Sequence, residues 1–116
     1  MNKNEELGFP FGAMKKITVC IDIDGTLRNN TSDKVIANED IRSLCRILRK
    51  FKNVKLIAWS GSGELYARQC ADKMHATHFF HGFASKTQHE EIKPDIAIDD
   101  IQDTAIGKIN LIVGEK

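Results

Sequence analysis

Two aspartates one residue apart, Asp22 and Asp24, lie between an apolar run and a Gly-Thr pair in the stretch KITVCIDIDGTL, residues 16–27. Carboxylates this close repel each other at neutral pH and therefore need a cation or a shared proton. A divalent metal ion meets that need, and carboxylate oxygens are ligands that Mg²⁺ accepts. The pair therefore predicts a metal-binding site.

The residues before this pair form the element that must position it. Apolar, β-branched residues predict a strand buried on both faces, as in a parallel sheet: Ile17, Val19, Ile21 and Ile23. Gly25 permits the sharp turn that lifts both carboxylates into the crevice at the carboxyl edge of the sheet.

Two later strands also end in residues that could do chemistry. Ser60 follows the apolar stretch 54–59, and Asp99 and Asp100 follow the stretch 95–98. Because the carboxyl ends of parallel strands share one edge, these side chains should converge with the first two aspartates. Such a cluster of oxygens suits Mg²⁺ and lacks the Cys and His expected of zinc. Small residues at 60–63, which include Gly61, also expose N–H groups that can hold an anion.

The rest of the chain predicts an α/β fold. Helices are expected at 38–51, capped by Asn38, and at 64–74, strands at 54–59, 77–80, 95–98 and 110–113, and helical turns at 87–92 and 103–106. The predicted inner faces are Ile41, Leu44, Cys45, Leu48 and Phe51 in the first helix, and Leu65, Tyr66, Cys70 and Met74 in the second. This alternation indicates a three-layer, Rossmann-like parallel sheet with helices on both faces.

The length of the chain allows one hydrophobic core, and its net charge is close to zero. The chain has 116 residues, of which 41% are hydrophobic, so we expect a leader at 1–14 and a single domain at 15–116. The formal charge of +1 creates no field that draws the whole chain to nucleic acid or a membrane. We find neither the ~20 apolar residues of a membrane span nor the apolar block of a signal peptide, so a cytoplasmic location is expected. Three cysteines should be reduced and buried: Cys20, Cys45 and Cys70.

These motifs together resemble the haloacid dehalogenase (HAD) superfamily of phosphohydrolases. Residues 22–26, DIDGT, match its first motif, Trp59-Ser60 its second, and 96–100, IAIDD, its fourth. The motifs follow the family's order, and the resemblance covers roughly residue 15 to the C-terminus. It implies an HAD-like, Mg²⁺-dependent phosphatase acting on a phosphorylated substrate.

The resemblance implies a role for each matching residue. Asp22 would attack phosphorus and become an aspartyl phosphate. Asp24 would be the general acid and then the base, while its backbone carbonyl meets the metal. Ser60 would hydrogen-bond a phosphoryl oxygen, beside Gly61. The implied metal ligands are Asp22, Asp24, Asp99 and Asp100.

Two positions remain open within the resemblance. Asp99 would be assisted by Asp100 or Asp103, through a bound water. The family also needs a lysine to offset the phosphate charge. We choose Lys86, which follows the third predicted strand at the catalytic edge, because an extended chain would leave Lys93 about 20 Å away. A short or irregular strand after Lys93 would favour that residue instead.

The family's cap domains are inserted after the first motif or before the lysine, where this chain has only residues 28–37 and 81–85. The chain therefore resembles a capless form. An open site of this kind suits a bulky substrate, such as a nucleic-acid end, a protein or a glycan. Alternatively, a neighbouring subunit of a homo-oligomer supplies the lid that excludes water.

Two other hypotheses stay open. A non-catalytic HAD-like module would bind phosphate or a phosphorylated partner without hydrolysis. A phosphoacceptor receiver domain also has a parallel sheet, clustered carboxylates and a lysine, but its acceptor follows a middle strand. The pair of Asp22 and Asp24 favours an enzyme, because a binding module needs neither an acid nor a base.

Two further patterns favour ordinary surface roles. Four basic residues are expected on the outer side of the first helix, as a solvated face or, alternatively, a surface for nucleic acid or a phosphorylated partner: Arg42, Arg46, Arg49 and Lys50. His75, His78 and His81 do not share one continuous helix, so we expect surface or partly buried histidines rather than metal ligands.

Overall fold

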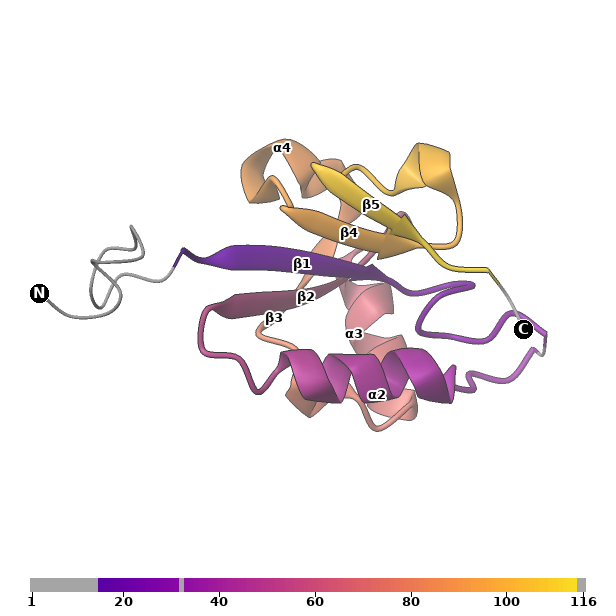
Figure 1. Ribbon diagram of the computed structural model, residues 1–116. Helices are drawn as coiled ribbons and strands as arrows, with labels where there is room; N and C mark the ends of the chain where they lie inside the picture. Colours follow the sequence, from indigo (N-terminus) through magenta and orange to yellow (C-terminus); the bar gives the residue numbers. More distant parts are fainter. Residues whose placement is uncertain (1–14, 32, 115–116) are drawn as a thin grey trace, which may run out of the picture.

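The computed structural model describes residues 15–31 and 33–114, so the leader predicted at 1–14 lies outside the described residues. Within the described ranges, five strands form one sheet (Figure 1): β1 (Ile17–Asp22), β2 (Val54–Ser60), β3 (Gly82–Ser85), β4 (Ile96–Asp99) and β5 (Ile109–Ile112). All neighbouring strands run parallel, in the order β3-β2-β1-β4-β5. The predicted parallel α/β architecture is confirmed, and the strand order is compatible with a Rossmann-like fold.

Helical segments connect these strands. In the described residues the α-helices are α2 (Glu39–Leu48), α3 (Glu64–Lys73) and α4 (His89–Ile92), and 3₁₀ turns cover Thr77–Phe79, Lys86–Gln88 and Gln102–Thr104. The start of α2 is confirmed, because the side chain of Asn38 accepts hydrogen bonds from the N–H groups of Asp40 and Ile41 at 3.2 and 3.4 Å. None of these helices has the length and apolar character needed to cross a membrane.

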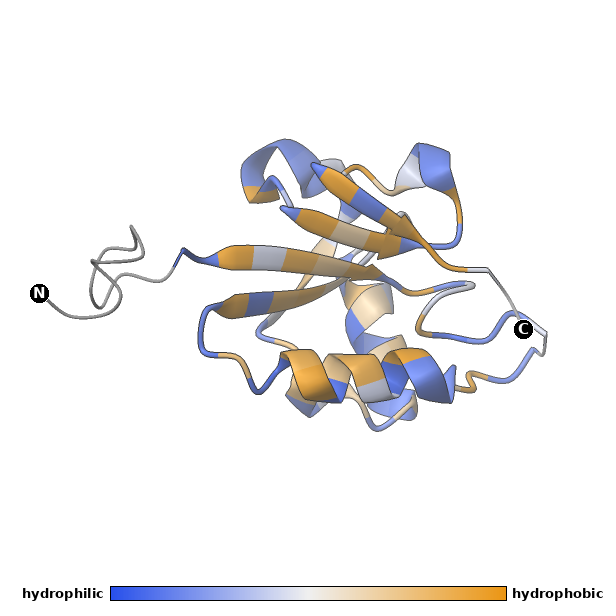
Figure 2. Cartoon of the chain, in the orientation of Figure 1, coloured by the Kyte–Doolittle hydropathy of each residue, from blue (hydrophilic) through white to orange (hydrophobic). Residues whose placement is uncertain are grey.

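Alternate residues of the central strands belong to two separate hydrophobic clusters, one on each face of the sheet. Val19 and Ile21 of β1 belong to the larger cluster, which includes buried residues of α2 and α3. Cys20 belongs to the smaller cluster on the other face, where Ile92 of α4 and Ala105 pack. Both faces are therefore covered, and β1 is mostly hydrophobic along its length in Figure 2. Burial on both sides explains the nearly continuous apolar run of β1.

The strand predicted at 77–80 is wrong. The chain leaves α3 through His75, which has a left-handed backbone with φ of 53°, and then forms the 3₁₀ turn at Thr77–Phe79. Phe79 and Phe80 are buried, but they fill the core from a connection rather than from a strand. The third strand is instead β3, which begins two residues after the predicted stretch, and it pairs with the end of β2.

Two predicted inner-face residues also point to solvent. Phe51 is 54% exposed because α2 ends at Leu48 and the residue lies beyond the helical stripe, and Leu65 is 66% exposed. The burial predicted for Cys70 of α3, and for Met74 directly after this helix, is confirmed. All three cysteines are buried free thiols, as predicted: Cys20, Cys45 and Cys70.

Candidate functional site

The candidate site lies where the order of the sheet reverses. From β1 the chain proceeds to β2 and β3 on one side, whereas β4 and β5 lie on the other side. Asp22 ends β1 and Asp99 ends β4, and these two strands pair directly. Ligands of open α/β sheets bind in the crevice outside the carboxyl ends at such a switch point.

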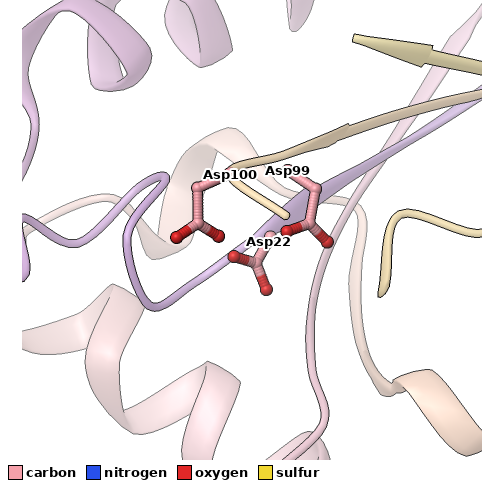
Figure 3. A group of neighbouring side chains, drawn as sticks. All are labelled: Asp22, Asp99 and Asp100. Atoms are coloured by element: carbon pink, nitrogen blue, oxygen red, sulfur yellow. The ribbon is translucent and has the colours of Figure 1, made fainter. Parts of the chain in front are cut away.

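Three carboxylates converge at this crevice. Asp22, Asp99 and Asp100 each offer an oxygen, and these oxygens all lie within 4.8 Å of one another. Figure 3 shows the three side chains pointing toward one another from the ends of β1 and β4. Asp22 is only 6% exposed and Asp99 only 1%, so their charges are largely removed from water. By contrast, Asp103 is exposed in the 3₁₀ turn that follows.

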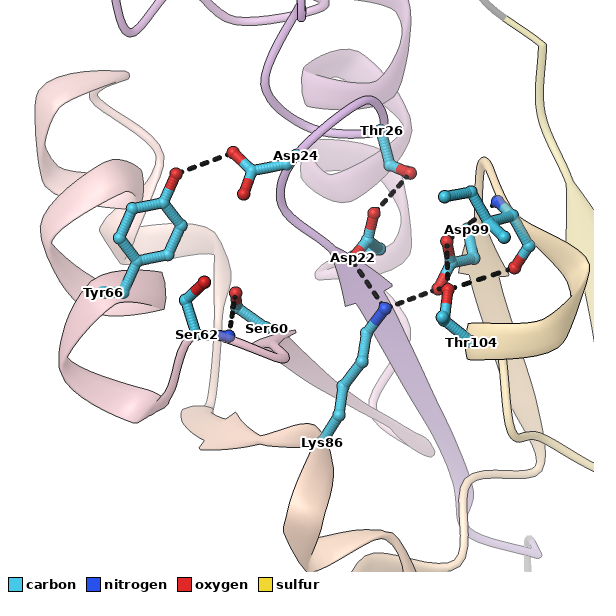
Figure 4. A network of polar contacts seen from close by, with 10 residues as sticks. Asp22, Asp24, Thr26, Ser60, Ser62, Tyr66, Lys86, Asp99 and Thr104 are labelled. Atoms are coloured by element: carbon cyan, nitrogen blue, oxygen red, sulfur yellow. Dashed lines mark hydrogen bonds and ion pairs between the residues drawn. The ribbon is translucent and has the colours of Figure 1, made fainter.

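Lys86 holds two of these carboxylates together. Its Nζ lies 2.8 Å from Oδ1 of Asp22 and 2.7 Å from Oδ2 of Asp99 (Figure 4). The lysine directly follows β3, where Ser85 and Gln88 form a capping box that fixes the start of the 3₁₀ turn. Lys93 is instead exposed at the end of α4, with φ of 49°. The structure therefore brings Lys86 to the cluster.

Two threonines orient the buried carboxylates. Thr26, itself fully buried, donates a hydrogen bond from Oγ1 to Oδ2 of Asp22 at 3.0 Å. Thr104 donates to Oδ2 of Asp99 at 3.2 Å, and the N–H of Ile101 donates to its Oδ1 at 3.0 Å. The sequence patterns did not indicate Thr104, because its contact with Asp99 depends on how the turn after β4 folds.

Burial and neighbouring charges separate the proton affinities of these groups. Burial raises the pKa of Asp22 to about 7, and the charge of Asp99 adds to this, although Lys86 and Thr26 oppose it. Burial would also raise the pKa of Asp99, but the hydrogen bonds from Lys86 and Ile101 outweigh it and leave that pKa below its usual value. Burial and the hydrogen bond with Asp99 raise the pKa of Asp100. Burial acts to lower the pKa of Lys86, yet its bonds to Asp22 and Asp99 raise it, so the ammonium stays charged.

We compared the chain with protein-family models, curated proteins and solved structures. None of them matched it.

The donor set at the crevice fits a hard divalent cation. Asp22, Asp99 and Asp100 supply only oxygen ligands, which Mg²⁺ prefers over the nitrogen and sulfur ligands typical of zinc. Lys86 neutralises one carboxylate charge, which leaves excess negative charge when all three acids are ionised. This group could therefore hold a metal ion.

The side chain of Asp24 contacts other residues than the three clustered carboxylates do. Its Oδ1 accepts hydrogen bonds from the hydroxyl of Tyr66 at 2.7 Å and from Nη1 of Arg28 at 3.1 Å. The side chain is 40% exposed, and its carboxylate does not belong to the group of three. The role predicted for its backbone carbonyl stays a prediction. The sequence pattern placed Tyr66 on an apolar helix face and gave no sign of its contact with Asp24. The position of Arg28, four residues after Asp24, could have indicated the ion pair between these two residues.

Ser60 and Gly61 lie at the end of β2, beside the cluster. The Oγ of Ser60 accepts a hydrogen bond from the N–H of Ser62 at 3.0 Å, so its own hydrogen remains available for donation (Figure 4). Gly61 is exposed in the following turn. The site can thus offer a hydroxyl donor, an ammonium and several carboxylates along one sheet edge.

Proposed function

We propose that the chain is a Mg²⁺-dependent phosphatase that hydrolyses phosphomonoesters through an aspartyl phosphate on Asp22. The observation that carries this proposal is the position of Lys86, whose ammonium contacts both Asp22 and Asp99 at the switch point of the sheet. An anion and a divalent cation can both be held there, next to a carboxylate fixed for attack. Such positioning and charge neutralisation are what phosphoryl transfer requires.

In the first half-reaction, a carboxylate oxygen of Asp22 forms a bond to phosphorus as the ester P–O bond breaks. Asp24 gives its proton to the leaving alkoxide, while Ser60 and Lys86 donate hydrogen bonds to phosphoryl oxygens. A bound Mg²⁺ would supply charge neutralisation for the phosphate and for the carboxylates of Asp22, Asp99 and Asp100.

In the second half-reaction, Asp24 takes a proton from water as the water oxygen attacks phosphorus. The bond between phosphorus and Asp22 breaks, which releases inorganic phosphate and restores the carboxylate. Asp24 suits both steps by position, because its exposed carboxylate lies at the same sheet edge without joining the buried cluster.

The same proposal includes an HAD-like fold without a cap. Arg28 and Ala37, at the two ends of the first insertion point, form an antiparallel bridge, and the second insertion point is occupied largely by β3 itself. On this proposal the edge is open, which suits a bulky phosphorylated substrate, or a lid from a second subunit. The receiver-domain alternative is disfavoured, because such domains have the strand order 2-1-3-4-5 rather than the order found here.

Release of inorganic phosphate tests the proposal. The substrates are aryl phosphates, sugar phosphates, nucleotides, phosphopeptides and 5′- or 3′-phosphorylated oligonucleotides, each with Mg²⁺ and with chelator. We expect turnover that requires the metal. The Asp22→Asn variant should lose this turnover but remain folded, as measured by thermal unfolding. The matched control is Asp72→Asn, at an exposed position of α3, which should keep full activity. Unchanged turnover in Asp22→Asn would refute the mechanism, and Mg²⁺-dependent binding without turnover would favour a non-catalytic module.

A further inference from the structure

Positive charge is concentrated in one stretch of a nearly neutral chain. Between Asp40 and Glu64 the sequence holds six Lys or Arg and neither Asp nor Glu, although the whole chain has a formal charge of only +1. Arg42 is used within the fold, where its guanidinium donates to the backbone carbonyls of Met74 and His75. The other five form what we call the basic patch: Arg46, Arg49, Lys50, Lys52 and Lys55.

The basic patch is exposed and lacks acidic partners. All five side chains are exposed, and none forms an ion pair with a carboxylate among the described residues. Figure 1 shows that α2 runs back against the strands, so its C-terminal end and the start of β2 lie at the amino edge of the sheet. This edge is opposite the carboxylate cluster, so the basic patch is a separate surface.

A histidine also lies at this edge of the sheet. His81 contacts Arg49 through Nε2, and its Nδ1 accepts a hydrogen bond from the N–H of Leu56 at 2.9 Å. The imidazole of His81 therefore lies directly against the guanidinium of Arg49, beside the basic patch. Burial and the charges of Arg49, Lys55 and Lys16 lower the pKa of His81, although the hydrogen bond from Leu56 opposes this shift.

An exposed aromatic residue lies between two lysines of the basic patch. Phe51 lies between Lys50 and Lys52 and is 54% exposed, although a phenylalanine of this chain could have been expected in the core. A cationic surface that follows a phosphate backbone, combined with an aromatic side chain on which a base can stack, is how proteins bind single-stranded nucleic acid.

We propose that the basic patch and Phe51 form a binding surface for single-stranded nucleic acid. A membrane surface fits less well, because Ile47 and Phe51 offer far less than the broad apolar face of an interfacial helix. An acidic protein would be served by the cations alone and would leave the exposed ring unexplained. The surface is independent of the phosphatase proposal, since it lies at the other edge of the sheet and its test is binding.

The test is binding of fluorescently labelled, unphosphorylated dT12 and U12 to the full chain in chelator, which silences any metal-dependent turnover. We expect affinity to fall with salt, with a log–log slope of roughly −3.5 for about five contacts. Arg49→Gln should weaken binding several-fold and flatten this slope. Arg68→Gln, the same change at an exposed arginine of α3, should leave both unchanged.

Phe51→Leu separates stacking from simple apolar contact. Leucine keeps an apolar side chain but has no ring, so the loss of one stacked base should weaken oligonucleotide binding by roughly fivefold or more. Thermal unfolding verifies that each variant is folded. Two results would overturn the proposal: no binding of either oligonucleotide at low salt, whether or not vesicles of anionic lipid are bound, or equal binding by Phe51→Leu and the unmodified chain.

Discussion

Lys86 and Asp22 lie 2.8 Å apart although the whole of β2 separates the strands that precede them. The lysine reaches across the carboxyl edge of the sheet and contacts Asp99 as well. Its ammonium thus lies between two largely buried carboxylates. The stability of this region should depend on that one positive charge.

Removal of the ammonium should destabilise the protein in the absence of metal. We expect Lys86→Met to lower the free energy of unfolding in chelator by about 2 kcal/mol or more, because it leaves buried carboxylates without a counter-charge. Saturating Mg²⁺ should restore more stability to this variant than to the unmodified chain. Denaturant unfolding with chelator and with Mg²⁺ measures both effects. The control is Lys93→Met, at an exposed lysine, and equal stability of the two variants would contradict the prediction.

The raised pKa of Asp22 predicts a specific dependence of stability on pH in chelator. A carboxyl with a pKa of about 7 when folded, above its ordinary 3.8, binds its proton more tightly in the folded state. Its contribution is therefore fully present below pH 4 and is lost as pH rises toward 7, by at most ~1.4 kcal/mol per pH unit. Urea unfolding at pH 5 and pH 8 should show this loss, and Asp22→Asn should abolish it. An identical slope in the two proteins would disprove this assignment.

The geometry of the site requires a glycine at position 25. Its backbone has φ of +82°, and a Cβ there would clash with Oδ2 of Asp100. We expect Gly25→Ala to cost about 1–3 kcal/mol of stability and to weaken Mg²⁺ binding by displacing that carboxylate. Thermal unfolding and calorimetric titration with Mg²⁺ measure the two effects. Gly82→Ala, where a Cβ would meet open space, should change neither.

The sequence predicted the elements whose patterns are local. The apolar run of β1, the cap at Asn38 and the turn at Gly25 each depend on neighbours in the chain, and the structure contains all three. The strand predicted at 77–80 failed because buried aromatics occur in connections as well as in strands. His75, with its left-handed backbone, carries no sequence signal strong enough to reveal that connection.

Contacts made across elements were harder to predict. Parallel topology was enough to place Asp22, Asp99 and Lys86 at one edge, because strand ends share that edge. The sequence did not predict the contacts of Thr104 with Asp99 and of Tyr66 with Asp24, because these hydroxyls reach the aspartates only after a turn and a helix have packed. Phe51 was assigned to the core because its spacing continues a helical stripe, but the helix ends three residues earlier.

Tyr66 offers the sharpest test of how Asp24 acts. Its hydroxyl and Arg28 both donate to Oδ1 of Asp24, and among the described residues Oδ2 accepts no hydrogen bond, so Oδ2 is the oxygen left to exchange a proton with the substrate. On the proposed mechanism, Tyr66→Phe should disorder that carboxylate and slow leaving-group release by roughly tenfold for alkyl phosphates.

The same variant should release p-nitrophenolate at nearly the unmodified rate, because a good leaving group needs no proton. First-turnover rates are the proper measurement, since they exclude the later step in which Asp24 acts as a base. Asp24→Asn should show the same selectivity more strongly. If Tyr66→Phe slows both substrates equally, the tyrosine supports the fold of the site rather than the orientation of the acid.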